Sequence, residues 1–158
     1  MRLLFVCTGN TCRSPLAEGI ARRLIADRRL TDLEVSSSGT SAWPDAPASD
    51  GSLLVALEHE IDLGDHRARQ LSPEIVLNAD LILAMGPHHL DRVEALGGSD
   101  RSWLLTAYAS SSRTGRAVSD PFGGDLDVYR ATFAELLTEI GAILDRVEAE
   151  RSRPTNLS

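Results

Sequence analysis

The residues best suited to chemistry lie in one short stretch near the N-terminus, residues 7–15, which reads CTGNTCRSP. An apolar run over residues 2–6 precedes it and is typical of a buried strand, and apolar residues at helical spacing follow over residues 16–25. The stretch is therefore expected to turn from a strand into a helix. Gly9 and Asn10 tolerate left-handed backbone angles, so the N–H groups of this turn can point inward as an anion-binding nest.

Further features of the same turn favour an anion beside a reactive thiol. The start of the following helix adds unpaired N–H groups and the positive end of the helix dipole, and Arg13 adds a planar fork of donors. A thiol at the opening of such a nest should favour the thiolate form, which is the nucleophile. We therefore expect Cys7 to attack a phosphoryl group. The rest of the loop would bind that group, through Thr8, Gly9, Asn10, Thr11, Cys12, Arg13 and Ser14.

A cysteine followed after five residues by arginine and serine is the signature of cysteine-dependent phosphatases, whereas a buried cysteine beside an ordinary turn is the plain structural alternative. The twelve residues CTGNTCRSPLAE lie close to the N-terminus. In this the chain resembles the low-molecular-weight protein tyrosine phosphatase family, and within it most closely the bacterial protein-arginine phosphatases. The resemblance implies a single domain with a four-stranded parallel sheet flanked by helices.

A second catalytic element is expected in a long polar loop over residues 106–124, since structureless loops of this length are often functional. Near its end the loop reads SDPFGG, from Ser119 to Gly124. An isolated Asp-Pro pair most often opens a turn. The family that the chain resembles carries an Asp-Pro general acid in this late loop, and Asp120 matches it.

The expected reaction is phosphate-ester or phosphoramidate hydrolysis through a cysteinyl-phosphate intermediate. The leaving group departs more easily when it is protonated, which is the role of Asp120, and the same carboxylate can then activate water. Arg13 and the loop N–H groups would hold the phosphoryl oxygens through both steps. Ser14 can hydrogen-bond to the sulfur of Cys7 and stabilise it as a leaving group.

The resemblance also implies two supporting residues. In that family a serine and a histidine from neighbouring loops hold the loop asparagine, and Ser37 and His66 match them for Asn10; Ser36 and Ser38 leave the serine ambiguous by one residue. A surface histidine is the alternative for His66. The four histidines show no ligand pattern, so neither a metal nor any other cofactor is expected, and the pair at 88–89 is interpreted as a solvated helix start.

Cys7 and Cys12 are the only two cysteines of the chain, and both lie in the loop. They cannot link distant parts of the fold, so a chemical role is favoured over a structural one. Cys12 could pack as a small apolar side chain. Alternatively, it could form a disulfide with oxidised Cys7 and protect it from irreversible oxidation.

Thr11 is the residue that favours phosphoarginine over phosphotyrosine. Tyrosine-directed members of the family usually carry a bulky aliphatic residue there, whereas a threonine hydroxyl offers a partner for guanidinium N–H groups. Phe122 is the one aromatic residue after the Asp-Pro pair, which suits a group thinner than a phenyl ring. Trp43, in a small-residue loop expected to line the pocket opening, could serve phosphotyrosine equally well, so a tyrosine phosphatase remains the alternative.

Two other classes of protein fit the sequence less well. An arsenate reductase of this fold relays a disulfide through further cysteines, and none follows Cys12. An inactive phosphate-binding module would be expected to lack the nucleophile, the arginine or the acid. All three are present, as Cys7, Arg13 and Asp120.

Composition sets the broad class. The 158 residues are 42% hydrophobic and 25% charged, which is ordinary for one globular domain. The net charge of −7 argues against nucleic acid as a partner, and no apolar run is long enough to span a membrane. No signal peptide is visible, so a cytoplasmic location is expected. The helices and loops show no apolar stripe beyond what the core needs, so a monomer is expected, and the resemblance implies phosphorylated proteins as its substrates.

The elements that must position the loop alternate between strands and helices. Strands are expected over residues 2–6, 33–37, 80–85 and 102–105, and helices over residues 16–25, 50–60, 72–78, 87–96 and 126–150. This alternation predicts a single doubly wound α/β domain over residues 1–150, with a disordered tail over 151–158. Leu53, Leu54 and Leu57 of the second helix, and Val128 and Leu137 of the last, are expected to face the core. The phosphate-binding loop after the first strand then lies at the carboxyl edge of the sheet, where such folds bind ligands.

Overall fold

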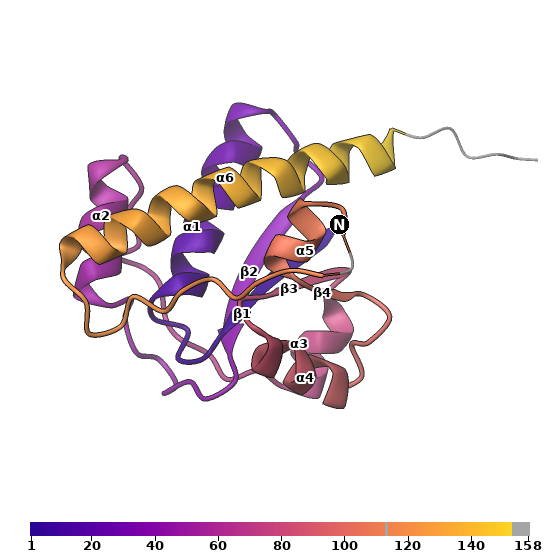
Figure 1. Ribbon diagram of the computed structural model, residues 1–158, viewed down its shortest axis with the longest axis horizontal. Coiled ribbons are helices and arrows are strands. Elements are labelled where there is room, and N and C mark those ends of the chain that lie inside the picture. The colour runs from indigo at the N-terminus through magenta and orange to yellow at the C-terminus, as the bar shows by residue number, and fades with distance from the viewer. Residues whose placement is uncertain (113, 153–158) are drawn as a thin grey trace, which may run out of the picture.

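A four-stranded parallel sheet with strand order β2-β1-β3-β4 forms the centre of the molecule (Figure 1). The computed structural model describes residues 1–112 and 114–152. The strands are β1 (Arg2–Cys7), β2 (Glu34–Gly39), β3 (Leu81–Ala84) and β4 (Ser102–Leu104). The helices are α1 (Arg13–Asp27), α2 (Asp50–Glu58), α3 (Pro73–Asn78), α4 (Pro87–Ala95), α5 (Leu105–Ala109) and α6 (Leu126–Arg151).

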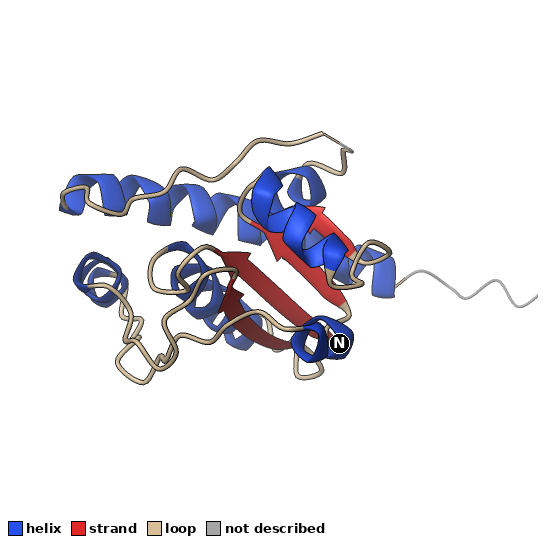
Figure 2. Ribbon diagram, turned by 90° about the horizontal axis from the view of Figure 1, so that it is seen from below, coloured by secondary structure: helices blue, strands red, loops and turns tan. Residues whose placement is uncertain are grey.

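Helices cover both faces of the sheet, as expected for a doubly wound domain (Figure 2). Alternate residues of β1 point to opposite faces, because the side-chain period of a strand is two. Leu3 and Phe5 belong to the larger core, which α1, α2, α5 and α6 complete. Leu4 and Val6 belong to the smaller core beneath α3 and α4. Burial on both faces explains why β1 and β3 are continuously apolar.

The expected alternation of strands and helices is confirmed, with one omission. The stretch after β4 is not structureless throughout, because its first residues form the short helix α5, whose Leu105 and Tyr108 are buried in the larger core. The sequence gives little warning of α5, since a helix of five residues shows barely more than one turn of periodicity. The remaining loop leads to α6, which begins at Leu126. Asp125 is its N-cap residue, and the Asp125 side chain accepts a hydrogen bond from the N–H of Val128.

The expected inward faces of two helices were partly wrong. In α2 the buried residues are Ser52, Val55 and Ala56, whereas Leu54 and Leu57 are more than half exposed. In α6, Val128 and Leu137 lie at the surface, at 43% and 39% exposure. Both helices pack only one narrow side, so apolar residues next to that side remain in contact with water, as is common at protein surfaces.

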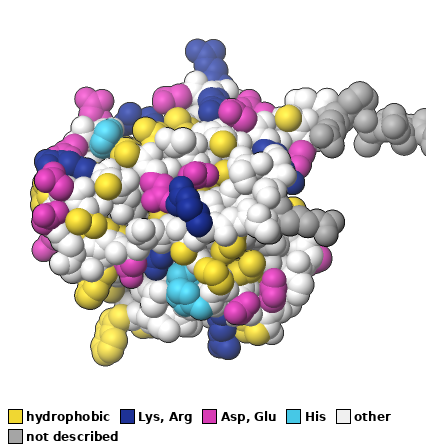
Figure 3. Space-filling view, in the orientation of Figure 1, with side chains coloured by type: hydrophobic (Ala, Val, Ile, Leu, Met, Phe, Trp, Pro, Cys, Tyr) yellow, Lys and Arg dark blue, Asp and Glu magenta, His cyan; other side chains and the backbone are white. Residues whose placement is uncertain are grey.

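The last helix extends further than expected. Helix α6 continues to Arg151, one residue beyond its expected end, and residues 153–158 of the predicted tail lie outside the described part of the chain. Acidic and basic side chains are interspersed over the face that α6 crosses (Figure 3). Among residues 1–112 and 114–152, no helix combines the length and the apolar character needed to cross a membrane.

Candidate active site

Cys7 is the last residue of β1, the strand that lies between β2 and β3. Its side chain is buried, and its sulfur lies 2.9 Å from the hydroxyl oxygen of Ser14, in the first turn of α1. Because Cys7 ends a central strand of a parallel sheet, its thiol lies at the carboxyl edge of the sheet, where the N-terminus of α1 faces it.

Asn10 organises the loop between β1 and α1. It is fully buried and has a left-handed backbone with φ of 56°. Its side-chain amide donates to Ser14 Oγ at 2.7 Å and to Ser37 Oγ at 2.9 Å, and its oxygen accepts from the N–H of Arg69 at 3.0 Å. The donation to Ser14 leaves the hydroxyl hydrogen of Ser14 free to point at the sulfur of Cys7. Asn10 thereby orients the group that faces the thiol.

The backbone of Asn10 is held as well. His66 Nε2 donates to the carbonyl oxygen of Asn10 at 2.7 Å, and the other ring nitrogen lies 3.9 Å from a carboxylate oxygen of Glu18. The structure thus brings His66 and Ser37 to Asn10, as the sequence led us to expect, and selects Ser37 over its two neighbours. Glu18, which is 9% exposed, is an addition that the sequence alone did not suggest.

Close approach of two chain segments also shapes the loop. Gly39, at the end of β2, lies so near that a Cβ there would overlap the carbonyl oxygen of Thr8 and stand 2.9 Å from the amide nitrogen of Asn10. Among the loop residues, only Asn10 adopts a left-handed backbone, so Gly9 does not use the freedom expected of it. The glycine that this fold requires is Gly39, which ends an otherwise unremarkable run of serines.

Arg13 lies beneath the loop with 5% of its surface exposed. Its Nη1 donates to the carbonyl oxygen of Val118 at 2.9 Å, and its Nη2 lies 3.7 Å from a carboxylate oxygen of Asp120. Its Nε is buried without a hydrogen-bond partner among the described residues. A buried donor without a partner is costly, so this geometry is suited to an anion that binds the guanidinium from the loop side.

Asp120 comes to the site from a loop more than a hundred residues away in sequence. Its side chain is 51% exposed, and its second oxygen accepts from the N–H of Phe122 at 3.1 Å. Together with Phe122 it closes one side of a cavity of about 240 Å³. The rest of the lining comes from the loop, namely Cys7, Thr8, Gly9, Thr11, Cys12 and Arg13.

Thr11 and Cys12 are neighbours at the cavity, with the hydroxyl oxygen of Thr11 3.8 Å from the sulfur of Cys12. Thr11 is partly exposed and lines the cavity. Cys12 is buried, with its sulfur 3.3 Å from the hydroxyl oxygen of Ser49 and 3.5 Å from that of Tyr129. Burial and the contact with Cys12 raise the pKa of Tyr129, so this hydroxyl remains protonated and available as a donor. Cys12 is therefore joined to a small polar network behind the loop.

Two expected features differ in the structure. Helix α1 begins at Arg13 with Cys12 in the N-cap position, three residues before the expected start at residue 16. Trp43 is 82% exposed and does not line the cavity. Trp43 comes two residues after Ser41, and the N–H of Ser41 donates to the carbonyl oxygen of Thr8. The loop that carries Trp43 therefore borders the site.

The interpretation of the pair at 88–89 as solvated was wrong for one of its members. His88 is exposed, but His89 is fully buried, with its Nε2 2.8 Å from the hydroxyl oxygen of Thr8. Burial and, to a lesser degree, the positive charges of His88 and Arg13 lower the pKa of His89 to about 4. Its place three residues after Gly86, at the start of α4, puts it beneath the loop, and no local sequence pattern signals this contact.

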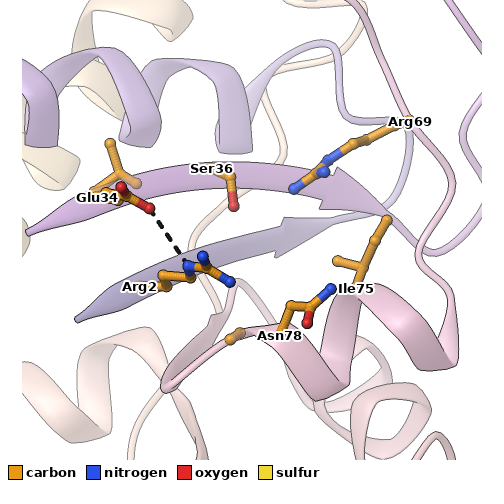
Figure 4. A pocket seen from close by; sticks show the side chains of 8 residues that line it. Arg2, Glu34, Ser36, Arg69, Ile75 and Asn78 are labelled. Atoms are coloured by element: carbon orange, nitrogen blue, oxygen red, sulfur yellow. Dashed lines mark ion pairs between the residues drawn. The ribbon is translucent and has the colours of Figure 1, made fainter.

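A second hollow lies away from the phosphate loop. This hollow lies between β2 and α3, and in it Arg2 forms an ion pair with Glu34 (Figure 4). Its lining includes Arg2, Glu34, Ser36, Arg69, Ile75 and Asn78. No residue of the phosphate loop lines it. Within the described ranges, no group of three histidine, cysteine or acidic side chains lies close enough together to hold a metal ion.

A thiol, an anion nest, a buried guanidinium and a carboxylate around one cavity are the parts of a cysteine-dependent phosphatase. The family comparison agrees with this class. Residues 2–153 match the model of the low molecular weight phosphotyrosine protein phosphatases, and the chain belongs to this family.

Similar proteins carry two different substrate names. The chain is 41% identical to the low molecular weight protein-tyrosine-phosphatase PtpB of Staphylococcus haemolyticus, over 90% of this chain and 97% of that protein. It is 35% identical to the protein-arginine-phosphatase of Bacillus subtilis, over 96% of this chain and 99% of that one. A solved structure of YwlE arginine phosphatase, a C7S mutant with phosphorylated active site serine, matches with a TM-score of 0.87 at 34% identity, covering 96% of this chain and 98% of the other.

Proposed function

We propose that this protein hydrolyses phosphoarginine residues of proteins through a cysteinyl-phosphate intermediate, with Cys7 as nucleophile, Arg13 as phosphate clamp and Asp120 as general acid and base. The similar YwlE structure supports the nucleophile, because it is a C7S mutant with a phosphorylated active site serine.

In the first step the Cys7 thiolate attacks phosphorus and forms the S–P bond while the P–N bond to the substrate breaks. Asp120 gives its proton to the departing guanidine nitrogen, which needs it, because guanidine is a much stronger base than a phenolate, with pKa values above about 12 and about 10. Arg13 and the N–H groups of the loop balance the charge on the phosphoryl oxygens.

In the second step Asp120 takes a proton from water, which attacks the phosphorus of the cysteinyl-phosphate and breaks the S–P bond. The sulfur leaves as a thiolate. Ser14 stabilises it, since its hydroxyl lies 2.9 Å from the sulfur and Asn10 already donates to its oxygen. Inorganic phosphate then leaves the cavity.

The observation that carries the arginine assignment is Thr11 at the wall of the cavity, with a side chain that can accept a hydrogen bond from guanidinium N–H groups. Among residues 1–112 and 114–152, Phe122 is the one aromatic side chain that lines the cavity, and Gly123 follows it with a φ of 79°. A single aromatic wall suits a thin planar group. The alternative substrate, phosphotyrosine, is favoured by the similarity to PtpB.

The test compares kcat/KM on matched phosphoarginine and phosphotyrosine peptides for the wild type, Thr11→Ile and Thr11→Ser. The wild type should prefer phosphoarginine. Thr11→Ile should shift the ratio toward phosphotyrosine by about tenfold or more, the usual size of a lost hydrogen bond to a charged group. Thr11→Ser keeps the hydroxyl and should retain the preference. A wild type that prefers phosphotyrosine would overturn the assignment.

A further inference from the structure

We propose that His89 is a positioning residue for phosphoryl transfer, because it holds the side chain of Thr8 so that the Thr8 hydroxyl donates a hydrogen bond into the active-site cavity.

The contact that carries this inference joins α4 directly to the phosphate loop. His89 is fully buried, and its Nε2 lies 2.8 Å from the hydroxyl oxygen of Thr8. Thr8 is the residue after Cys7, and it lines the cavity beside that thiol. Its carbonyl oxygen is engaged elsewhere, by the N–H of Ser41 at 2.9 Å. The hydroxyl is thus the group of Thr8 that His89 controls.

The surroundings of the ring decide which nitrogen carries the proton. The other nitrogen, Nδ1, is buried without a hydrogen-bond partner among the described residues. It lies against Gly86, where a Cβ would stand 3.5 Å from it and 3.6 Å from the side chain of Ala117. A buried N–H without a partner is rarer than a buried acceptor without one, so the proton belongs on Nε2.

This tautomer fixes the direction of both hydrogen bonds. Nε2–H donates to the oxygen of Thr8, and the hydroxyl hydrogen of Thr8 is then free to point into the cavity. The low pKa of His89, about 4, agrees with a neutral ring, set mainly by burial and opposed by the charge of Asp120. A phosphoryl group in the cavity is rich in acceptors and lacks donors, so a donor at Thr8 stabilises it.

His89 also lies where Arg13 is anchored. The N–H of Val118 donates to the carbonyl oxygen of Met85, one residue before Gly86, at 2.8 Å, and the carbonyl oxygen of Val118 accepts from Arg13. Thr8, near the start of the loop, and Arg13, near its end, are therefore both tied to the junction after β3. His89 supplies the first of these ties.

The test measures kcat/KM for p-nitrophenyl phosphate and the inhibition constant of inorganic phosphate in His89→Phe, His89→Gln, Thr8→Val and the double variant His89→Phe/Thr8→Val. His88→Phe is the matched control, since it changes the exposed neighbour on the same helix. Thermal unfolding of each variant is measured in parallel.

His89→Phe should lower kcat/KM by about tenfold and weaken phosphate inhibition by a similar factor, as expected for one hydrogen bond that acts on a charged group. Thr8→Val should have the same effect on both constants. The kcat/KM of the double variant should lie no more than about twofold below that of the less active single variant, because both changes remove the same interaction. His89→Gln places an amide N–H near the position of Nε2 and should recover activity to within about threefold of wild type. His88→Phe should leave both constants unchanged.

Additive losses in the double variant, or His89→Gln as inactive as His89→Phe, would overturn the inference and leave His89 a packing residue. Should His89→Phe fail to fold, nitrogen-15 spectra of the wild-type imidazole give the answer, since the proposal requires a proton on Nε2 and none on Nδ1 at pH 7. The opposite tautomer would contradict it. The inference rests on the proposed role of the loop, and that role fails separately, if Cys7→Ala retains turnover.

Discussion

Replacing Asn10 by alanine should destabilise the protein more than any other single change in the phosphate loop. The side chain makes three hydrogen bonds, to Ser14, Ser37 and the N–H of Arg69, the first two of them buried. At about 1 kcal/mol for each, their loss costs about 3 kcal/mol. Alanine at a φ of 56° adds about 1 kcal/mol of backbone strain. The sum, about 4 kcal/mol, is a large share of the total stability of a small domain.

Urea unfolding of Asn10→Ala and Asn10→Gly separates the two terms. Glycine lacks the same hydrogen bonds but adopts the left-handed backbone without strain, so Asn10→Gly should be about 1 kcal/mol more stable than Asn10→Ala. Both variants should also lose at least about tenfold in kcat/KM, because Ser14 is no longer oriented toward the sulfur of Cys7. The reasoning is refuted if the free energy of unfolding of both variants lies within about 1 kcal/mol of that of the wild type, a margin well below the cost expected for three lost hydrogen bonds.

Three further outcomes are expected. Gly39→Ala should cost about 2 kcal/mol and lower kcat/KM at least about tenfold, because its Cβ would overlap the backbone of Thr8. His89 has a pKa of about 4 in the folded protein against 6.5 ordinarily, so the unfolded chain binds the extra proton between these values and stability is lost as pH falls through this window. Wild type should therefore lose about 2 kcal/mol more than His89→Phe between pH 7 and pH 4 in urea unfolding, a value reduced for solvent screening near the cavity. Mild peroxide should convert Cys7 and Cys12 into a disulfide that thiols reverse, as peptide mapping would show.

Each of these has a clear contrary result. A Gly39→Ala variant with wild-type activity would show that the loop tolerates displacement. Parallel pH profiles of wild type and His89→Phe would mean that His89 titrates alike in the folded and unfolded chains. Sulfinic acid at Cys7 as the only oxidation product would exclude a protective role for Cys12.

The sequence predicts most of the fold because the strands are short, apolar and separated by helical patterns. β1 and β3 are buried on both faces, so their composition alone marks them. Helix α5 was missed because five residues show too little periodicity. The inward face of α2 was misjudged because leucines bordering a narrow contact look the same in sequence as leucines within it.

The site was predictable where its residues form a local pattern and not where they meet through the fold. Cys7, Asn10 and Arg13 stand in one loop, and their spacing indicates their chemistry. Asp120 was reached through the family resemblance, since an Asp-Pro pair alone is ambiguous. Gly39 and His89 carry no local signal, because their importance comes from contacts with Thr8 that exist only once β2 and α4 lie against the loop.

The most direct test of the central claim is to trap the covalent intermediate. The wild-type protein, mixed with a phosphoarginine peptide and quenched in acid within its first turnovers, should carry up to one added phosphoryl group, located by mass spectrometry on the peptide that contains Cys7. Cys7→Ala, treated in the same way, should carry none. Turnover of the peptide by Cys7→Ala, or a phosphoryl group on any residue other than Cys7, would contradict the account.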